Sequence, residues 1–222
     1  MPPWACLADG TRPMTPKEDR AINAALHNMA LWNPCGCFEM DMPVIMAVDV
    51  EPDELVGFNY LLNAKGGPSK WLHCFLHDRQ IQRIWNNPNA YMAAIRRQGY
   101  GGIFSPDFSL YMDMPLPLQI FNTYRSRWVG AYMQAHGIPV VPTVGWAGPA
   151  SFDFCFLGIE PGGTVAISTI GIKTDAARAV FFAGYEAMTE RLKPSRVLIY
   201  GRTLEGLGGR YYPPCYEKLR HG

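Results

Sequence analysis

Residues 164–200, TVAISTIGIKTDAARAVFFAGYEAMTERLKPSRVLIY, decide the fold class. Two short apolar runs rich in β-branched residues, at 164–167 and 196–200, flank a helical segment at 175–192. Each run is bounded by glycine or proline, which is typical of strands that are buried on both faces. A strand, a helix and a second strand of these lengths predict a βαβ unit with parallel strands.

The same alternation extends over most of the chain. Further apolar runs stand at 44–48, 71–76, 102–104 and 138–141, and further helical segments at 79–85 with 89–98, at 116–136 and at 151–157. The runs recur at intervals of roughly 25 to 30 residues, the size of a βα unit. The connection LVGFNYLL at 55–62 fits neither pattern clearly. We therefore predict an α/β protein with a parallel sheet of about six βα units, and favour a small or incomplete (β/α) barrel over an open doubly wound sheet.

The two ends of the chain differ from this central pattern. Thr15 and Glu18 form the two positions of a capping box around Pro16, and apolar residues at helical spacing follow, so we predict a helix over 16–31. We expect a single α/β domain over 1–222, with an N-terminal helical segment at about 1–41 and an irregular C-terminal tail at about 203–222.

Composition excludes several classes of protein. Of 222 residues, 48% are hydrophobic and 18% are charged, with 20 Lys and Arg against 19 Asp and Glu. A disordered chain would be less hydrophobic, and a protein that coats nucleic acid would carry a clear basic excess. The sequence has neither an apolar run long enough to span a membrane nor the layout of a signal peptide, so we expect a cytoplasmic protein without a membrane partner.

Cysteine usage gives little evidence for a metal site. Cys74 and Cys155 lie in apolar stretches and are expected to be small buried hydrophobic residues. Cys35 and Cys37 are separated by one residue, and Cys6 with Cys215 would complete four thiolates only if the termini met. Structural zinc sites use a wider spacing, so free thiols are the favoured interpretation.

Polar residues follow each apolar run. Ligands bind at the carboxyl ends of parallel strands, so these residues should converge on one edge of the sheet. The candidates at the successive exits are Asp49; His77 and Asp78; Ser105, Asp107 and Ser109; Trp146; Ser168; and Arg202.

Asp107 is the central catalytic candidate. Ser105, Asp107 and Ser109 alternate and share one face of an extended segment, which Pro106 keeps out of the helical region. A carboxylate between two hydroxyls can serve as a general base, a nucleophile or a cation ligand. The structural alternative is an Asx-type turn.

Asp49 or Asp78 is expected to be the second catalytic carboxylate. The structural alternatives are a solvated loop for Asp49 and a helix N-cap for Asp78. The hydroxyl of Ser168 has the alternative of satisfying backbone groups at the strand end. Trp146 is predicted to stack on a ring, sugar or base of the substrate, and Arg202 to hold an anionic group.

A polar stripe without Glu or Lys marks the helical segment at 116–136. It includes Gln119, Asn122, Arg125 and Arg127. Such a stripe fits a partner surface or the wall of a site. The two arginines are suited to clamp a carboxylate or phosphate, or they pair structurally with Asp113 or Glu160.

Common cofactor and catalytic motifs are absent. No G-x-G-x-x-G follows the first apolar run and no P-loop occurs, so nicotinamide, flavin and P-loop nucleotides are not expected. Zinc-hydrolase, deaminase and G-x-S-x-G patterns are also missing. A divalent cation held by carboxylates stays open. His73 lies in an apolar run and is expected to be a satisfied core residue.

Several stretches resemble an uncharacterised domain-of-unknown-function family found in bacteria, phages, prophages and plasmids. They are LVGFNY at 55–60, IWNNP at 84–88, FSPDFSLY at 104–111, QIFNTYRSRW at 119–128, VPTVGW at 141–146, SFDF at 151–154 and VAIST at 165–169. The similarity covers about residues 42–202, roughly three quarters of the chain. It implies an association with mobile elements and carries no activity.

The sequence thus favours an enzyme that hydrolyses or transfers a glycosidic or phosphoester bond of a small polar or anionic substrate. The alternative is a non-catalytic accessory protein that binds a nucleic acid or host protein on the face with Gln119, Asn122 and Arg127.

Overall fold

The structure is a computed structural model that describes residues 15–33 and 39–214. The chain divides into two compact units, Met1–Cys35 and Gly36–Gly222. The thiols of Cys6, Cys35, Cys37 and Cys215, which were considered for a zinc site, lie outside the described residues.

In the first unit, α1 (Pro16–Leu26) starts with the predicted capping box. The Thr15 side chain accepts a hydrogen bond from the Glu18 backbone, and the Glu18 carboxylate accepts one from the Thr15 backbone. The helix ends before residue 31 because Asn28 adopts a left-handed φ of 59°. No residue of α1 is buried. Within this unit the helix is therefore stabilised by its caps rather than by packing.

All strands of the second unit run parallel and follow one another in sequence order. The first sheet contains β1 (Glu54–Gly57), β2 (Lys70–His73), β3 (Gly102–Phe104) and β4 (Val140–Val141), and the second contains β5 (Thr164–Ser168), β6 (Arg196–Tyr200) and β7 (Arg210–Tyr212). An isolated parallel bridge between Thr143 and Ala166 links the β4 exit to β5. The parallel α/β fold is thus confirmed.

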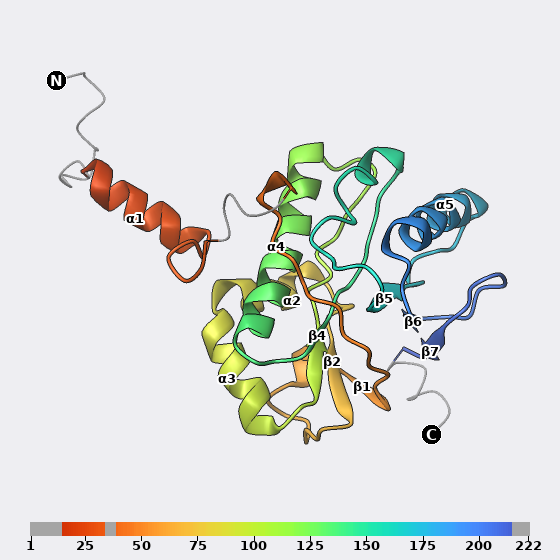
Figure 1. The fold of residues 1–222 in the computed structure, drawn as a ribbon, viewed down its shortest axis with the longest axis horizontal. Helices are drawn as coiled ribbons and strands as arrows, with labels where there is room; N and C mark the ends of the chain where they lie inside the picture. The colour runs from red at the N-terminus through yellow and green to blue at the C-terminus, as the bar shows by residue number, and fades with distance from the viewer. Residues whose placement is uncertain (1–14, 34–38, 215–222) are drawn as a thin grey trace. The chain divides into compact units, whose positions relative to one another are not determined.

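Helices connect the successive strands. They are α2 (Asp78–Asn86), α3 (Pro88–Gln98), α4 (Leu116–Ala135) and α5 (Asp175–Leu192), with short 3-10 turns η1 (Glu39–Asp41), η2 (Phe58–Tyr60) and η3 (Pro149–Ser151). The Asn87 side chain caps α3, and Gly99 ends it at a φ of 71° that suits glycine. Helices α2, α3 and α4 lie beside the first sheet and α5 beside the second (Figure 1).

The strands share one apolar core. Each strand contributes to it: Leu55, Trp71, Phe104, Val141, Ala166, Leu198 with Tyr200, and Tyr212, in strand order. However, the described residues form two separate hydrogen-bonded sheets, and no strand ladder joins β7 to β1. The strands therefore have the sequential order and common core of a barrel, but their ladders do not close into one.

Two elements expected from the sequence are absent. Residues 44–48 form only a bridge at Ile45, because the neighbouring Met46 and Ala47 amides donate to the side chains of Gln134 and Glu160 instead of a strand. The first strand lies at 54–57, within the stretch that the sequence left unassigned.

Residues 151–157 form turns rather than a helix. The carbonyls of Cys155 and Leu157 accept hydrogen bonds from Arg127, which fixes this segment from α4. At the other end of the chain, β7 lies within the expected irregular tail, which therefore contains a strand of the second sheet.

Candidate functional site

Ser105 ties the exits of β3 and β4 together. Its hydroxyl accepts a hydrogen bond from the Thr143 backbone at 2.9 Å, and the Thr143 hydroxyl donates to the Ser105 carbonyl at 2.7 Å. The Ser105 hydroxyl also lies 3.2 Å from that of Ser126 on α4. Because all three residues are buried, the chain leaving β3 has a fixed starting point for the loop that carries Asp107.

Asp78 anchors this loop to the next exit. It is the first residue of α2, and its carboxylate accepts hydrogen bonds from the Ser109 backbone at 3.1 Å and from the Ser109 hydroxyl at 2.7 Å. Asn122 of α4 donates to the Ser109 carbonyl at 2.7 Å. A carboxylate at a helix N-terminus is favourable, so Asp78 has a clear structural task.

The polar stripe of α4 lies inside the protein. Gln119 donates to the carbonyls of Tyr111 and Met114, while Asn122 and Arg127 bind other backbone carbonyls. Gln119, Asn122 and Arg127 are all buried. Gln119 and Asn122 therefore hold the loop after β3, and Arg127 holds the segment after β4. None of the three is an exposed surface for a partner.

Arg127 is only 2% exposed and is fixed by three backbone carbonyls. It donates to Thr143 at 3.0 Å, to Cys155 at 2.7 Å and to Leu157 at 2.9 Å. Burial lowers its pKa to about 10, against the effect of the nearby Cys155 and Asp107 groups. At neutral pH the guanidinium stays charged and acts as a fixed cation between β4 and α4.

Arg125 has a separate environment. It donates to Gln82 and Asn122, and its guanidinium lies 3.8 Å from the ring centroid of Phe108. Burial lowers its pKa, and Asp78 opposes that shift. The hydrogen-bond partners of Arg125 are thus amide side chains, rather than the acidic residues considered from the sequence.

Asp107 is the carboxylate of this region that remains without a hydrogen bond. Within residues 15–33 and 39–214 it forms neither a hydrogen bond nor an ion pair, although it is partly buried. Burial and the negative charge of Asp78 raise its pKa to about 7, and Arg127 acts in the opposite direction. At neutral pH the group is therefore divided between its protonated and ionised forms.

A small cavity borders Asp107. Its lining includes Asp107, Thr143 and Gly145, and its volume of about 10 Å³ is close to the minimum needed for one water molecule. A Cβ placed on Gly145 would lie 3.5 Å from the Asp107 Oδ1 atom, so this exit faces the carboxylate. The arrangement places a titratable carboxyl beside a space of about the size of one water molecule.

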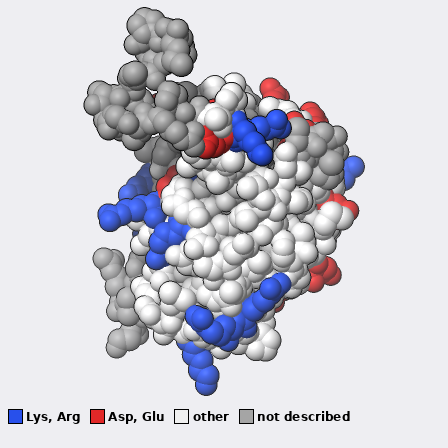
Figure 2. Space-filling view, turned by 90° about the vertical axis from the view of Figure 1, so that its left-hand side faces the viewer, with Lys and Arg blue, Asp and Glu red and all other residues white. Residues whose placement is uncertain are grey.

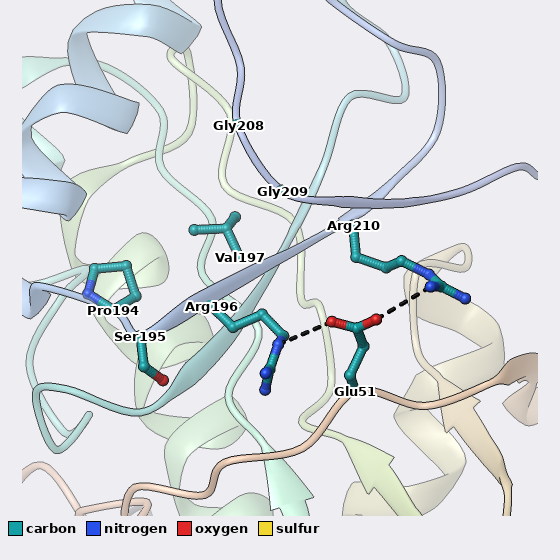
Figure 3. Close-up of a pocket in the computed structure, with 8 residues that line it drawn as sticks. All are labelled: Glu51, Pro194, Ser195, Arg196, Val197, Gly208, Gly209 and Arg210. Atoms are coloured by element: carbon teal, nitrogen blue, oxygen red, sulfur yellow. Dashed lines mark hydrogen bonds and ion pairs between the residues drawn. The ribbon is translucent and has the colours of Figure 1, made fainter.

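Asp49 is not brought to Asp107. It pairs with Arg196, the first residue of β6, so it lies at the end of the strands opposite to the exits. Glu51 joins Arg196 at 2.9 Å and Arg210 at 3.1 Å, along a groove of about 470 Å³ (Figure 3). The prediction for Asp49 depended on a strand at 44–48, and the absence of that strand removes its basis.

Trp146 lies against α5. Its indole packs on Phe181, with ring centroids 5.3 Å apart, and a Cβ on Gly184 would lie 2.2 Å from its Nε1 atom. The glycine is thus required for this close approach, and the indole contacts protein on that side.

The remaining predicted residues lie at their expected exits. The Ser168 hydroxyl donates to the Tyr200 carbonyl and accepts from the Ile170 backbone. The Arg202 carbonyl accepts a hydrogen bond from Thr169, and the Arg202 residue is exposed. His77 precedes α2 and is exposed, without a side-chain cap bond to that helix.

His73 was expected to be a satisfied core residue, and this is wrong in one respect. It is buried, with 1% exposure, but neither ring nitrogen has a hydrogen-bond partner in the described chain. Burial lowers its pKa to about 4. His73 is the last residue of β2 and comes two residues after Trp71, which belongs to the core. Because side chains two apart in a strand share a face, this spacing could have placed His73 on the inner face at a strand exit.

The buried cysteines behave as expected. Cys74 and Cys155 are free and buried, and burial raises the pKa of both thiols, that of Cys155 to about 12. Within the described ranges, no group of three or more His, Cys, Asp or Glu side chains is placed to hold a metal ion. None of the helices described is both long enough and apolar enough to cross a membrane.

Charged side chains are visible on one face of the protein. On the face drawn in Figure 2, Lys and Arg side chains occur in separate groups rather than in one continuous basic patch. This face therefore lacks the single basic surface typical of proteins that coat nucleic acid.

A family model described as a domain of unknown function, DUF4417, matches residues 37–212. The chain belongs to this family. The Gene 1 protein of Mycobacterium phage L5 is similar to this DUF4417 protein, with 38% identity over 190 residues that cover 81% of each chain. The Gene 1 protein of Mycobacterium phage D29 is 46% identical over 132 residues, which are 59% of this chain and 48% of that relative.

The DUF4417 chain thus spans about half the length of the D29 relative in that match. No solved structure matches it. These findings confirm the resemblance to an uncharacterised family and its occurrence in phages, and the names of the relatives state no activity.

Proposed function

We propose that this DUF4417 protein is an enzyme that transfers a proton at Asp107 during hydrolysis or transfer of a glycosidic or phosphoester bond. The observation that carries the proposal is a partly buried carboxylate, without a hydrogen bond in the described chain, at the exit of a parallel strand. A buried carboxylate without a partner is costly in a folded protein, and such groups concentrate at functional sites.

The pKa of Asp107 suits a group that both donates and accepts a proton. Its pKa of about 7 matches a group that gives up and accepts a proton near neutral pH. The neighbouring cavity is large enough for one water molecule, which Asp107 would activate as a general base. Arg127 is held in place by backbone carbonyls. Its positive charge would therefore stabilise negative charge that develops beside Asp107 during the reaction.

Entry of a substrate requires movement of the loop after Asp107, because the cavity holds only about one water molecule. The loop is attached by the contacts of Ser109 with Asp78 and Asn122, and by the contact of Gln119 with the Met114 carbonyl. The loop is also held by its apolar side chains, because Phe108 is buried against the Arg125 guanidinium and Leu110 packs on the core. Movement of the loop therefore has to break these contacts as well.

A second candidate function is that of a non-catalytic accessory protein that binds a host protein. It is favoured by exposed apolar side chains in the segment after Asp107, namely Tyr111, Met112, Leu116 and Leu118. Met112 is 71% exposed. Grouped exposed apolar residues are typical of interaction sites.

The two candidates are separated by Asp107→Asn. Purified protein is assayed with chromogenic glycosides, nucleosides and bis(p-nitrophenyl) phosphate, with and without magnesium. We expect turnover of one bond class and a loss of kcat of about 10²- to 10⁴-fold in the variant, with an unchanged fold by circular dichroism. Asp113→Asn, at an exposed position in the same loop, is the matched control and should keep full activity.

The proposal also predicts a pH profile. The wild-type kcat/KM should rise as the pH increases through about 7, because Asp107 acts as a general base in its ionised form. No turnover of either bond class by the wild type, or equal turnover by wild type and Asp107→Asn, would contradict the enzyme and leave the accessory protein.

A further inference from the structure

A second group of polar atoms without partners lies at the exits of β1 and β2. His73 ends β2, and Asn59 belongs to η2, which directly follows β1. Neither His73 ring nitrogen, nor the Oδ1 atom of Asn59, has a hydrogen-bond partner among the described residues, and all three atoms are buried. Buried polar atoms are paired in the great majority of cases, so a cluster of three requires an explanation.

These atoms approach the same point. A Cβ placed on Gly57, the last residue of β1, would lie 2.5 Å from Asn59 Oδ1 and 3.5 Å from His73 Nε2. The absence of a side chain at Gly57 therefore lets an amide oxygen and an imidazole nitrogen come together beside the backbone. The two atoms come from elements on neighbouring parallel strands, at the end where ligands bind in such folds.

An aromatic wall stands next to them. The His73 ring lies 4.3 Å from that of Tyr200 on β6, and Tyr200 stacks on Phe75 with centroids 5.2 Å apart and an interplanar angle of 12°. Phe75 is only partly buried. The His73 ring therefore adjoins a stacked pair of rings, of which Phe75 is partly exposed.

The environment is uncharged. Burial alone shifts the His73 pKa, and no neighbouring charged group contributes to the shift. The imidazole is therefore neutral at physiological pH and presents one donor and one acceptor nitrogen. Without a nearby cation the site does not suit an anion, and within the described chain no set of ligands is placed to hold a metal ion.

We propose that His73 and Asn59 bind the hydrogen-bonding edge of a neutral, planar heteroaromatic ring, a nucleobase, which stacks on Phe75. A nucleobase carries donors and acceptors in one plane, as the imidazole and the amide oxygen require, and a flat face for an aromatic side chain. Asn59 and Phe75 are only partly buried, so ring entry needs side-chain movement at η2 and not unfolding of a strand. This inference does not depend on catalysis at Asp107.

The test uses the full chain and a panel of nucleosides: adenosine, guanosine, cytidine and thymidine. Binding is followed by isothermal titration and by the ¹⁵N shifts of the His73 ring. We expect saturable binding of at least one nucleoside, a change at the His73 nitrogens, and affinity at least tenfold lower in His73→Phe, which keeps a ring in place. His27→Phe, at an exposed position outside the strand exits, should bind like the wild type.

Asn59→Leu removes the acceptor oxygen without changing β2, so the test does not depend on one variant. Three results would overturn the proposal. They are the absence of saturable binding to all four nucleosides, equal affinity in wild type and His73→Phe, and loss of binding in Asp107→Asn but not in His73→Phe. The last result would place the base at Asp107 and would separate this inference from the proposed catalysis.

Discussion

Asp107→Asn should change how the stability of the protein depends on pH. The Asp107 carboxyl titrates near 3.8 in the unfolded chain, whereas burial and Asp78 raise its pKa to about 7 in the folded protein. Between these values the unfolded chain releases the proton while the folded protein retains it. The contribution of Asp107 to stability is therefore complete below pH 3.8 and is lost as the pH rises through 7.

The size of this effect follows from the two pKa values. One unit of difference corresponds to about 1.4 kcal/mol, so a difference of about three units gives about 4 kcal/mol. His73 acts in the opposite direction, because burial lowers its pKa from 6.5 to about 4. Its stabilising contribution is present above 6.5 and is lost as the pH falls through 4. The two effects partly cancel in the wild type. The free energy of unfolding of each variant must therefore be compared with that of the wild type at the same pH.

The assay is urea unfolding, followed by tryptophan fluorescence, at pH values from about 4 to about 8. The free energy of unfolding of Asp107→Asn, relative to wild type, should rise by about 4 kcal/mol over that range, because asparagine has no proton to lose. Asp113→Asn, which is exposed, should show no such trend. A constant difference between Asp107→Asn and wild type would refute the conclusion that Asp107 is desolvated.

Two further changes test the packing around the exits. His73→Phe should gain about 3 kcal/mol of unfolding free energy relative to wild type as the pH falls from about 6.5 to about 4, in the same urea assay, and a flat difference would contradict the burial of a neutral imidazole. Gly184→Ala should lose about 1–3 kcal/mol in thermal unfolding, because its Cβ would lie 2.2 Å from Trp146. Gly67→Ala has no neighbour within 4 Å and is the control; equal melting temperatures for both would argue against the close contact at Trp146.

The sequence predicted the βαβ unit at 164–200 well because its evidence is local. Both strands are apolar runs with glycine or proline at their ends, and α5 fills the whole interval predicted for a helix. The run at 44–48 has the same local character but is not a strand, since its amides are bound by side chains 88 and 113 residues away. No local pattern contains that information.

The positions of the candidate site residues were predicted in part for the same reason. The alternation of Ser105, Asp107 and Ser109 placed these residues at the β3 exit, and the Ser109 contact brings Asp78 to them as expected for neighbouring exits. Asp49 was misplaced because its position depended on the wrong first strand. The unpartnered nitrogens of His73 could not be predicted, because hydrogen-bond satisfaction depends on residues distant in the chain.

The contacts of Glu51 have a consequence for biosynthesis. Its carboxylate joins Arg210, 159 positions later, and the neighbouring Pro52 carbonyl accepts a hydrogen bond from Tyr212, 160 positions later. A nascent chain emerging from the ribosome cannot form these contacts until residues 210–212 have been translated. Pairings so distant along the chain fold slowly and leave apolar surface open meanwhile. Newly made molecules should therefore depend on chaperones most strongly in the interval before residues 210–212 leave the ribosome.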